Sequence, residues 1–517
     1  LDFTKVFDKK TGEMVIKTSI AGKHLLALPQ LNKGTAFTEE EREDFGLLGK
    51  LPARVETLKE QVTRAYLQVS QYSTTLQKNI YLNNLHDKNH ILFYHLIRQH
   101  LAEFIPIIYT PTVGLAVQTF NREYRQPRGL YISHQYQDQL ETILKNRSNP
   151  DIDLIVVTDG EGVLGLGDQG VGGMDIPVAK LMVYSACGGV DPNRTLPIFL
   201  DVGTNNPDLL NDPFYLGCRH QRISEHEYDI FLDKFINRIH QHFPNAFLHW
   251  EDFGRSNARR ILLKYQNKIC SFNDDIQGTG ATTLAALLAA ANVTQMPLTQ
   301  HRFVVYGAGS AGTGVSDQIV AALVRLGLNQ EDAYKRFCLV DKQGLLFDND
   351  PNLTDAQKPY ARSALEFQRN PSAMSLLDTV KAFRPTVLIG CSAQAHHFTQ
   401  GIIDFMASYC DRPIVFPLSN PDDRCEASPH DILTWSNGKA LVATGTAFEA
   451  VHFNNQVFTI AQCNNALIYP GIGLGIIIVQ AIQVNEEMLW AAAITLSELS
   501  PSAHESFLPL LPSLAEA

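Results

Sequence analysis

One stretch of the chain joins an apolar run, a glycine-rich turn and an amphipathic run. Residues 302–306 are mainly β-branched or aromatic and predict a buried strand. The spacing Gly-x-Gly-x-x-Gly follows at 307–312, and residues 313–326 repeat apolar side chains at helical intervals. This order of strand, glycines and helix predicts a parallel α/β unit that binds the pyrophosphate of a dinucleotide at the helix N-terminus. The cofactor-binding residues are expected to be Gly307, Gly309, Ser310, Ala311 and Gly312.

The next apolar runs support a dinucleotide site. Residues 337–340 predict a second strand, which Asp341 ends. A carboxylate there accepts hydrogen bonds from ribose hydroxyls and repels a 2′-phosphate, which favours NAD over NADP, although the neighbouring Lys342 weakens this exclusion. Further strands are predicted at 386–389 and 414–416. The alternative for the glycines is a turn of small residues that serves packing alone.

Three carboxylates stand among aromatic and apolar neighbours. Glu251 and Asp252 lie in the run His-Trp-Glu-Asp-Phe at 249–253, and Asp275 lies in the run 272–279. Buried carboxylates repel one another and lose hydration, so a metal ion or a matched cation is the usual reason to keep them together. A set of oxygen ligands suits Mg²⁺ or Mn²⁺ rather than zinc. The alternative is that each acid caps the N-terminus of a helix.

The 517 residues are too many for one core and suggest several domains. Helical periodicity dominates residues 37–125, and Pro127 and Gly129 close this region. Short β-branched runs then predict strands at 154–159 and 196–202. Both runs lead into Asp and Gly, as strands of a parallel sheet do where ligands bind at their carboxyl ends.

Charge and cysteine content exclude some classes of partner. The net charge of −11 argues against nucleic acid and against an anionic membrane surface. The eight cysteines show no paired spacing, as in a reduced intracellular protein, and we expect a cytoplasmic location, or the mitochondrial matrix if the source is eukaryotic. No run of about 18 apolar residues predicts a membrane span, and the nearest, 471–484, predicts a buried helix.

Several motifs, taken in order along the chain, give a specific resemblance. These motifs are Tyr109-Thr-Pro-Thr-Val-Gly114, Val156-Val-Thr-Asp-Gly-Glu161, Gly165-Leu-Gly-Asp-Gln-Gly170, Asp201-Val-Gly-Thr-Asn-Asn206, Glu251-Asp-Phe253, Phe272-Asn-Asp-Asp-Ile-Gln-Gly-Thr279, Pro417-Leu-Ser-Asn-Pro421, Asn464-Asn465 and Tyr469-Pro-Gly471. With them, the sequence from about Leu31 to Pro501 resembles the malic enzyme family, which includes malolactic enzymes.

The resemblance implies oxidative decarboxylation of L-malate to pyruvate and CO₂ with NAD. It assigns the metal ligands to Glu251, Asp252 and Asp275. It also implies that Lys180 is the general base that takes the hydroxyl proton. A lysine can act as a base at neutral pH only if burial or a nearby charge lowers its pKa. Asp274 matches the acid that pairs with this lysine, although such a pairing would oppose loss of the lysine's proton.

The resemblance assigns three more residues. Tyr109 matches the general acid that protonates the enol of pyruvate, and Asn420 and Asn464 match amides that contact the substrate or the nicotinamide ribose. Without the resemblance, Tyr109 would be interpreted as a turn tyrosine before proline and Lys180 as a surface lysine on a helix. Asn420 would be interpreted as a turn former.

The family's fold implies an α/β architecture with an N-terminal helical domain, a central parallel-sheet α/β domain and a Rossmann-type NAD-binding domain. The expected boundaries are 1–127 for the helical domain, 128–273 completed by 464–517 for the central domain, and 274–463 for the NAD-binding domain. Family members are usually dimers or tetramers, so a homodimer or homotetramer is expected.

One departure leaves the reaction outcome open. Many malic enzymes have an arginine that binds the malate carboxylate where this chain has Gly162, and glycine cannot supply a charge-assisted bidentate contact. Arg128 and Arg255 are candidates to replace it, and the motifs favour neither. Malolactic enzymes share the glycine, so conversion of malate to lactate with tightly held NAD is the alternative function. A malate or nucleotide sensor without catalysis is the third, although the metal ligands and Lys180 are all present.

Overall fold

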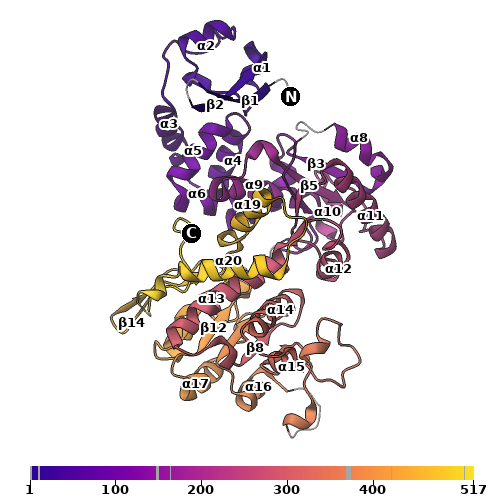
Figure 1. Cartoon of the computed structure of the whole chain (residues 1–517), viewed down its shortest axis with the longest axis vertical. Coiled ribbons are helices and arrows are strands. Elements are labelled where there is room, and N and C mark those ends of the chain that lie inside the picture. Colours follow the sequence, from indigo (N-terminus) through magenta and orange to yellow (C-terminus); the bar gives the residue numbers. More distant parts are fainter. Residues whose placement is uncertain are drawn as a thin grey trace. The chain divides into compact units, whose positions relative to one another are not determined.

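The computed structural model describes residues 3–9, 12–146, 151–163, 165–367, 374–420, 422–505 and 507–517 (Figure 1). The chain divides into two compact units, the first formed by residues 1–159 and 169–246 and the second by residues 160–168 and 247–517. The boundaries predicted for three domains stay a prediction.

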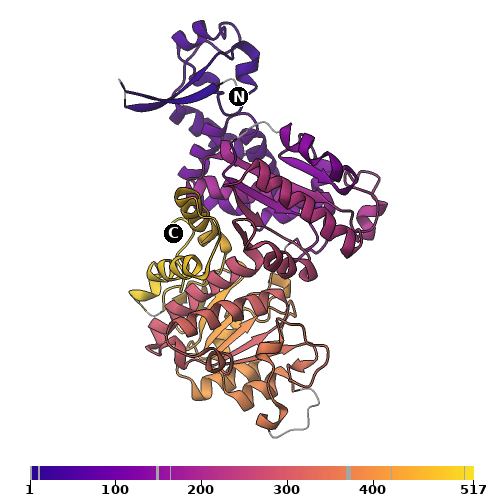
Figure 2. The same cartoon turned by 45° about the vertical axis from the view of Figure 1, so that its right-hand side comes forward.

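The first unit begins with a β-hairpin that the sequence analysis did not predict. Strands β1 (Phe3–Asp8) and β2 (Glu13–Thr18) pair antiparallel, and the hairpin projects at the indigo end of the chain (Figure 2). The expected helical region follows. Its helices are α1 (Gly22–Leu26), α2 (Glu39–Asp44), α3 (Leu58–Ser70), α4 (Thr75–His86), α5 (His90–Gln99), α6 (Leu101–Ile108) and α7 (Thr112–Glu123).

Helix α3 shows how the sequence sets these helices. Thr57 and Glu60 form a capping box that satisfies backbone N–H groups at its start. Val62, Ala65 and Val69 recur at helical spacing and form its buried face. The predicted helical periodicity of this region is therefore confirmed.

The first unit also holds parallel strands, in the order β3 (Leu130–Ser133), β5 (Thr195–Asp201) and β4 (Leu154–Thr158). The strands predicted near 154 and 196 are confirmed, and their carboxyl ends lie at one edge, with Thr158 opposite Phe199. The accompanying helices are α8 (Leu140–Lys145), α9 (Asp175–Gly188), α10 (Pro207–Asn211) and α11 (Glu225–His242), with short 3₁₀ turns at Gly34–Ala36, His134–Gln139, Gly170–Met174 and Pro192–Arg194.

The second unit contains a parallel pair, β6 (Phe247–Trp250) and β7 (Ser271–Asn273), joined through α12 (Arg255–Tyr265). A π-helical turn, Asp274–Gly278, follows β7 and leads into α13 (Thr279–Thr294). Helix α13 packs against α14 (Ser310–Arg325) and α20 (Glu486–Glu498).

The second unit also contains the predicted dinucleotide-binding sheet. Its order is β10 (Gly344–Leu345), β9 (Phe337–Asp341), β8 (Phe303–Tyr306), β11 (Val387–Gly390), β12 (Ile414–Pro417), β13 (Leu441–Thr444) and β16 (Ala461–Gln462). All neighbours are parallel except β10 with β9. Because the order reverses between β8 and β11, their carboxyl ends form the crevice in which Rossmann-type folds bind dinucleotides. The α/β fold class is confirmed.

Helices cover both faces of this sheet (Figures 1 and 2). The remaining helices are α15 (Gln330–Tyr334), α16 (Leu376–Phe383), α17 (Gln400–Tyr409), α18 (Pro429–Trp435) and α19 (Tyr469–Val479), and a small hairpin joins β14 (Val451–Phe453) and β15 (Gln456–Phe458). Short 3₁₀ turns lie at Leu298–Gln300, Lys358–Tyr360, Ala364–Phe367, Asp422–Arg424, Asn465–Leu467 and Pro501–Ala503. In the described ranges no single helix is long and apolar enough to cross a membrane, although the bent pair α6 and α7 passes by length and composition.

Candidate active site

The three carboxylates predicted as metal ligands lie together in the second unit. Glu251 and Asp252 follow β6, and Asp275 follows β7 in the π-helical turn. Because β6 and β7 are parallel, the segments that leave their carboxyl ends lie at the same edge. One oxygen of each carboxylate lies within 4.8 Å of the others, and the Asp252 N–H donates to Asp275 Oδ2 at 2.9 Å. We call these three residues the acidic cluster.

The acidic cluster fits a hard divalent cation. Glu251 and Asp252 are each 3 % exposed, so their charges have largely lost water as a compensating solvent. Asp252 adopts a left-handed backbone with φ of +55°, a conformation that costs energy in residues other than glycine and that often marks a functional site. Oxygen ligands and burial together are the chemistry of a Mg²⁺ or Mn²⁺ site.

A histidine that the sequence analysis did not single out contacts the acidic cluster. His249 is fully buried, and its Nε2 is hydrogen-bonded to Glu251 Oε2 at 2.8 Å. His249, Glu251 and Asp274 form a second group whose ligand atoms also lie within 4.8 Å of one another. Glu251 belongs to both groups, and His249 is placed to fix the orientation of its carboxylate.

Asp274 is held by an asparagine next to the one predicted. Asp274 is fully buried, and Asn465 Nδ2 donates to its backbone oxygen and to Oδ2, both at 3.1 Å. Gly278 makes room for Asp274, because a Cβ at this position would overlap Asp274 Oδ1. The Asn464 side chain instead accepts a hydrogen bond from the Ala466 N–H at 2.9 Å and caps a short turn.

A steric constraint explains why residue 162 is glycine and not the expected arginine. The Gly162 N–H donates to Asp252 O at 2.9 Å, and a Cβ on Gly162 would lie 2.7 Å from Phe253 O. Glu161 fills the space beside Gly254 and accepts a hydrogen bond from Asn257 Nδ2 at 3.1 Å. This backbone arrangement therefore leaves no room for an arginine at residue 162.

Gly162→Ala is expected to lower the free energy of unfolding by about 1–3 kcal/mol, the usual cost of overpacking. Thermal and urea unfolding measure this loss. Gly401→Ala in α17 is the matched control, because a Cβ there meets no atom within 4 Å. Equal free energies of unfolding for the two variants would show that the Phe253 carbonyl moves aside without loss of stability.

In the first unit, Lys180 and Tyr109 lie close together. Lys180 is 2 % exposed on α9, and its Nζ lies 5.5 Å from the centroid of the Tyr109 ring. Tyr109 is buried at the end of α6, where its carbonyl accepts the Val113 N–H at 2.8 Å. The interpretation of Lys180 as a surface lysine is therefore excluded, whereas the catalytic roles of both residues stay predictions.

The sequence patterns did not predict a buried ion pair between Asp159 and Arg222 in this unit. Asp159 follows β4 and is fully buried, and it forms an ion pair with Arg222 in which Nη1 and Oδ2 are 3.3 Å apart. Tyr228 donates its hydroxyl to Asp159 Oδ2 at 2.6 Å. Arg222 and Tyr228 are distant from Asp159 in sequence, so no local sequence pattern predicts either contact.

The dinucleotide turn in the second unit has the predicted form. Gly307 has a φ of +102°, which favours glycine, and a Cβ there would overlap the Cys391 backbone. A Cβ on Gly312 would overlap Gly307 O, so this glycine lets α14 pack closely. The space beside Gly309, the N-cap of α14, is open. This cradle at a helix N-terminus fits a pyrophosphate.

The other predicted cofactor residues are distributed around this turn. Ser310 and Ala311 form the first turn of α14, and Ser310 Oγ donates to Arg255 O at 3.0 Å. Asp341 ends β9 as predicted and accepts the Lys342 N–H at 2.9 Å. Asn420 is exposed beyond β12. Pro421, the last residue of that motif, lies outside the described residues.

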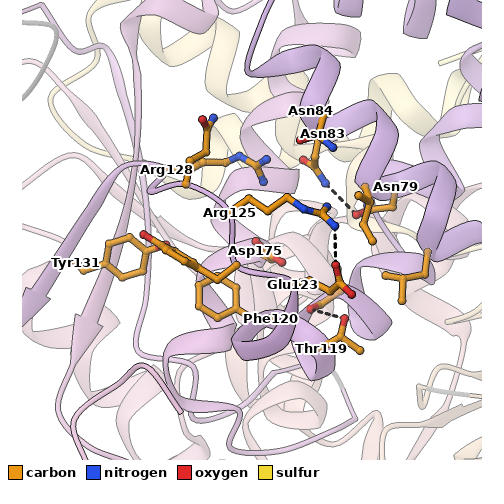
Figure 3. Close-up of a pocket in the computed structure, with 15 residues that line it drawn as sticks. Asn79, Asn83, Asn84, Thr119, Phe120, Glu123, Arg125, Arg128, Tyr131 and Asp175 are labelled. Carbon is orange, nitrogen blue, oxygen red and sulfur yellow. Dashed lines mark hydrogen bonds and ion pairs between the residues drawn. The ribbon is translucent and has the colours of Figure 1, made fainter. Parts of the chain in front are cut away.

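A pocket with both polar and apolar lining residues in the first unit reaches the helix that carries Lys180 (Figure 3). Asp175, the first residue of α9, lines it together with Arg125, and Arg125 donates to Glu123 at 2.8 Å. Arg128 binds both carboxylate oxygens of Asp87, at 3.0 and 2.6 Å. Arg128, one of the candidates to bind malate, is thus already engaged by a carboxylate of the protein.

Burial raises the pKa of the Asp175 carboxyl to about 6, although the charge of Arg128 opposes the shift. The folded state therefore binds a proton more tightly than the unfolded state, and Asp175 lowers stability as pH rises through about 6. Asp175→Asn is expected to be more stable than the parent by about 1–2 kcal/mol at pH 8, with solvent screening allowed for, and to lose this advantage at pH 4.

Urea unfolding of both proteins at a series of pH values measures the difference. Asp138→Asn, at a side chain 85 % exposed, is the control and is expected to follow the parent. A constant difference between Asp175→Asn and the parent across this range would contradict the assignment.

Comparison with known proteins agrees with this geometry. Residues 86–266 match the family model described as malic enzyme, N-terminal domain, and residues 276–517 match malic enzyme, NAD binding domain. The chain is 49 % identical over 490 residues to NAD-dependent malic enzyme 3 of Bacillus subtilis, covering 93 % of this chain and 87 % of the relative. It is 51 % identical over 495 residues to the NAD-dependent malic enzyme of Photorhabdus laumondii, covering 95 % and 88 %.

Solved structures share the fold. The malic enzyme of Entamoeba histolytica matches with a TM-score of 0.54 at 22 % identity, covering 91 % of this chain and 83 % of that one. The NAD-dependent malic enzyme of Thermotoga maritima matches with a TM-score of 0.51 at 23 % identity, covering 80 % and 89 %. With family models over most of its length and relatives near half identity, the chain belongs to the malic enzyme family.

Proposed function

We propose that the chain catalyses the NAD-dependent oxidative decarboxylation of L-malate to pyruvate and CO₂. The observation that carries the proposal is the buried acidic cluster in a chain about half identical to proteins named NAD-dependent malic enzyme. The glycine cradle before α14 supports the use of NAD.

The acidic cluster would hold Mg²⁺ or Mn²⁺, and the Gly307 turn with Asp341 would hold NAD. When bound, the ion would supply Lewis-acid stabilisation of enolate charge, and NAD would supply the hydride acceptor. His249 would orient Glu251 within the metal site through the hydrogen bond at 2.8 Å. Asn420 and Asn464 are proposed to contact the substrate or the nicotinamide ribose.

Lys180 is proposed to take the proton from the C2 hydroxyl, and Tyr109 to deliver a proton to C3 of the enol after CO₂ leaves. Their separation of 5.5 Å, from Nζ to ring centroid, supports this proposal, because both side chains lie in one buried region. Asp274 is proposed to pair with Lys180. Asn465 donates to Asp274 Oδ2 at 3.1 Å and so fixes the orientation of this carboxylate.

The test is a product assay with purified protein, L-malate, NAD and Mn²⁺. NADH and pyruvate are expected to rise in equal amounts. Lactate that accumulates without net NADH would replace the proposal with the malolactic reaction, which the glycine at residue 162 also allows. Binding of NAD and Mn²⁺ without any product would replace it with a sensor.

We also propose a homodimer or homotetramer in the cytoplasm, with the three-domain boundaries given above. Exposed apolar side chains on the first hairpin support self-association, since Phe7 and Met14 are 57 % and 61 % exposed. Light scattering during size-exclusion chromatography measures the assembly, and a monomer at micromolar concentration would contradict it.

A further inference from the structure

Two loops meet beside the dinucleotide turn in the second unit. The β11 loop, residues 391–398, follows β11, and the β12 loop, residues 418–420 with 422–426, follows β12. The Cys391 backbone occupies the space where a Cβ on Gly307 would lie, so the β11 loop packs directly on the dinucleotide turn. Any group that positions the β11 loop therefore acts at the edge of the cofactor crevice.

Glu426 joins these two loops. It is fully buried, and Ser392 donates to its Oε1 through the backbone N–H at 2.9 Å and through Oγ at 2.8 Å. Ser419 donates to the same oxygen through Oγ and to Oε2 through its N–H at 3.4 Å. The Ala393 N–H donates to Ser419 Oγ at 2.8 Å, which completes a chain from one loop through the other to Glu426.

The backbone reinforces this connection. The Phe398 N–H donates to Glu426 O at 3.0 Å, and the His396 N–H donates to Cys425 O at 3.3 Å. A Cβ on Gly390, the last residue of β11, would overlap the Glu426 carboxylate. The β11 loop is thus tied at both ends to the segment that carries Glu426.

The hydrogen bonds alone do not explain why residue 426 is a glutamate and not a neutral residue. Neutral glutamine would also join two loops, whereas an ionised carboxylate is expensive to bury without a cation. Within the described ranges the structure gives Glu426 no ion pair, and its hydrogen-bond donors are backbone N–H groups and hydroxyls. Burial, and after it the neighbouring Glu426 carboxylate, raise the pKa of Tyr306 and of Cys391.

The sheet order indicates which half of NAD is close to this charge. Asp341 ends β9 and marks the side of the crevice that holds the adenosine ribose. Strands β11 and β12 lie on the other side of β8, so the loops that follow them border the nicotinamide half. Oxidised nicotinamide carries a positive charge that it loses on reduction to NADH.

We propose that Glu426 is a positioning residue that fixes the β11 and β12 loops and whose buried negative charge favours oxidised over reduced nicotinamide. The inference rests on the NAD-dependent function proposed above and adds a residue to it. Glu426 acts through Ser392 and Ser419 and through its field, without contact with the substrate.

The test compares the Kd of NAD⁺ with the Kd of NADH for the full-length parent and for Glu426→Gln, by calorimetry without malate. The ratio Kd(NAD⁺)/Kd(NADH) is expected to rise at least about fivefold in the variant, the size of one partly screened charge interaction. Glu426→Asp keeps the charge on a shorter side chain, and we expect it to return the ratio toward the parent value. Equal weakening of both nucleotides, or no change in either, in Glu426→Gln would overturn the proposal.

Ser392→Ala is the second variant, and it keeps the proposal testable if Glu426→Gln does not fold. It removes one hydroxyl donor and keeps the charge, so both nucleotides are expected to weaken equally. A rise in the ratio for Ser392→Ala would overturn the electrostatic role. Nucleotide binding needs no turnover, so failure of the malate product assay alone would defeat the proposed reaction and leave these binding results standing.

Discussion

Replacing Lys180 by alanine is expected to lower kcat by about 10³- to 10⁴-fold, the upper part of the range for loss of a general base. The buried position of Lys180 over the Tyr109 ring is the reason, because solvent cannot easily supply a substitute base there. The KM for NAD is expected to stay within about twofold, since Lys180 is proposed to act on the substrate hydroxyl.

Steady-state kinetics with saturating Mn²⁺ measure this effect. Lys145→Ala in α8 is the matched control, because that side chain is 66 % exposed and its ion pair with Glu141 lies on the surface. Its kcat is expected to equal that of the parent. A Lys180→Ala enzyme that folds normally and keeps a tenth of the parent kcat would remove Lys180 from the proton transfer.

Replacing Asp275 by asparagine is expected to raise the Kd of Mn²⁺ at least about 100-fold, more than the usual cost of losing a group that only supports a ligand. The variant also relieves repulsion within the acidic cluster. Its metal-free form is therefore expected to melt above the metal-free parent, and its melting temperature is expected to fall below that of the parent once Mn²⁺ is added.

Electron paramagnetic resonance of free Mn²⁺ measures the affinity, and calorimetry with and without Mn²⁺ measures the crossing of the melting temperatures. Asp355→Asn is the control, because this carboxylate is 96 % exposed and pairs only at the surface with Lys358. If Asp275→Asn bound Mn²⁺ as tightly as the parent, the acidic cluster would not be the metal site.

Local patterns predicted the parts of the fold whose cause is local. The strand, glycines and helix around Gly307 were predictable because the turn geometry and close packing that demand glycine lie within one short segment. The strand that ends at Asp341 was predictable because its apolar run also lies within one short segment. The first hairpin was missed, because its alternation is short and its apolar residues Phe7 and Met14 are exposed.

Contacts that depend on the tertiary fold were not predictable in this way. Glu426 lies close after two aspartates and an arginine and resembles surface charge in the sequence. It is nevertheless fully buried, and its hydrogen-bond donors include Ser392, which is 34 residues away in the sequence. Asn465 was noted as part of a motif, but side-chain direction decides that it, and not Asn464, contacts Asp274. The burial of the proposed metal ligands Glu251 and Asp252 was predictable, because their aromatic and apolar neighbours signal it.

The division of the chain has a consequence for recombination between homologous genes. The chain crosses from one compact unit to the other at 159–160, 168–169 and 246–247. A chimera with a single breakpoint between 168 and 246 would take residues 160–168 from one parent and their packing partners, Asp252, Phe253 and Gly254, from another. Functional chimeras are therefore expected to exchange residues 160–168 together with the segment from residue 247, which takes three crossovers, at 159–160, 168–169 and 246–247.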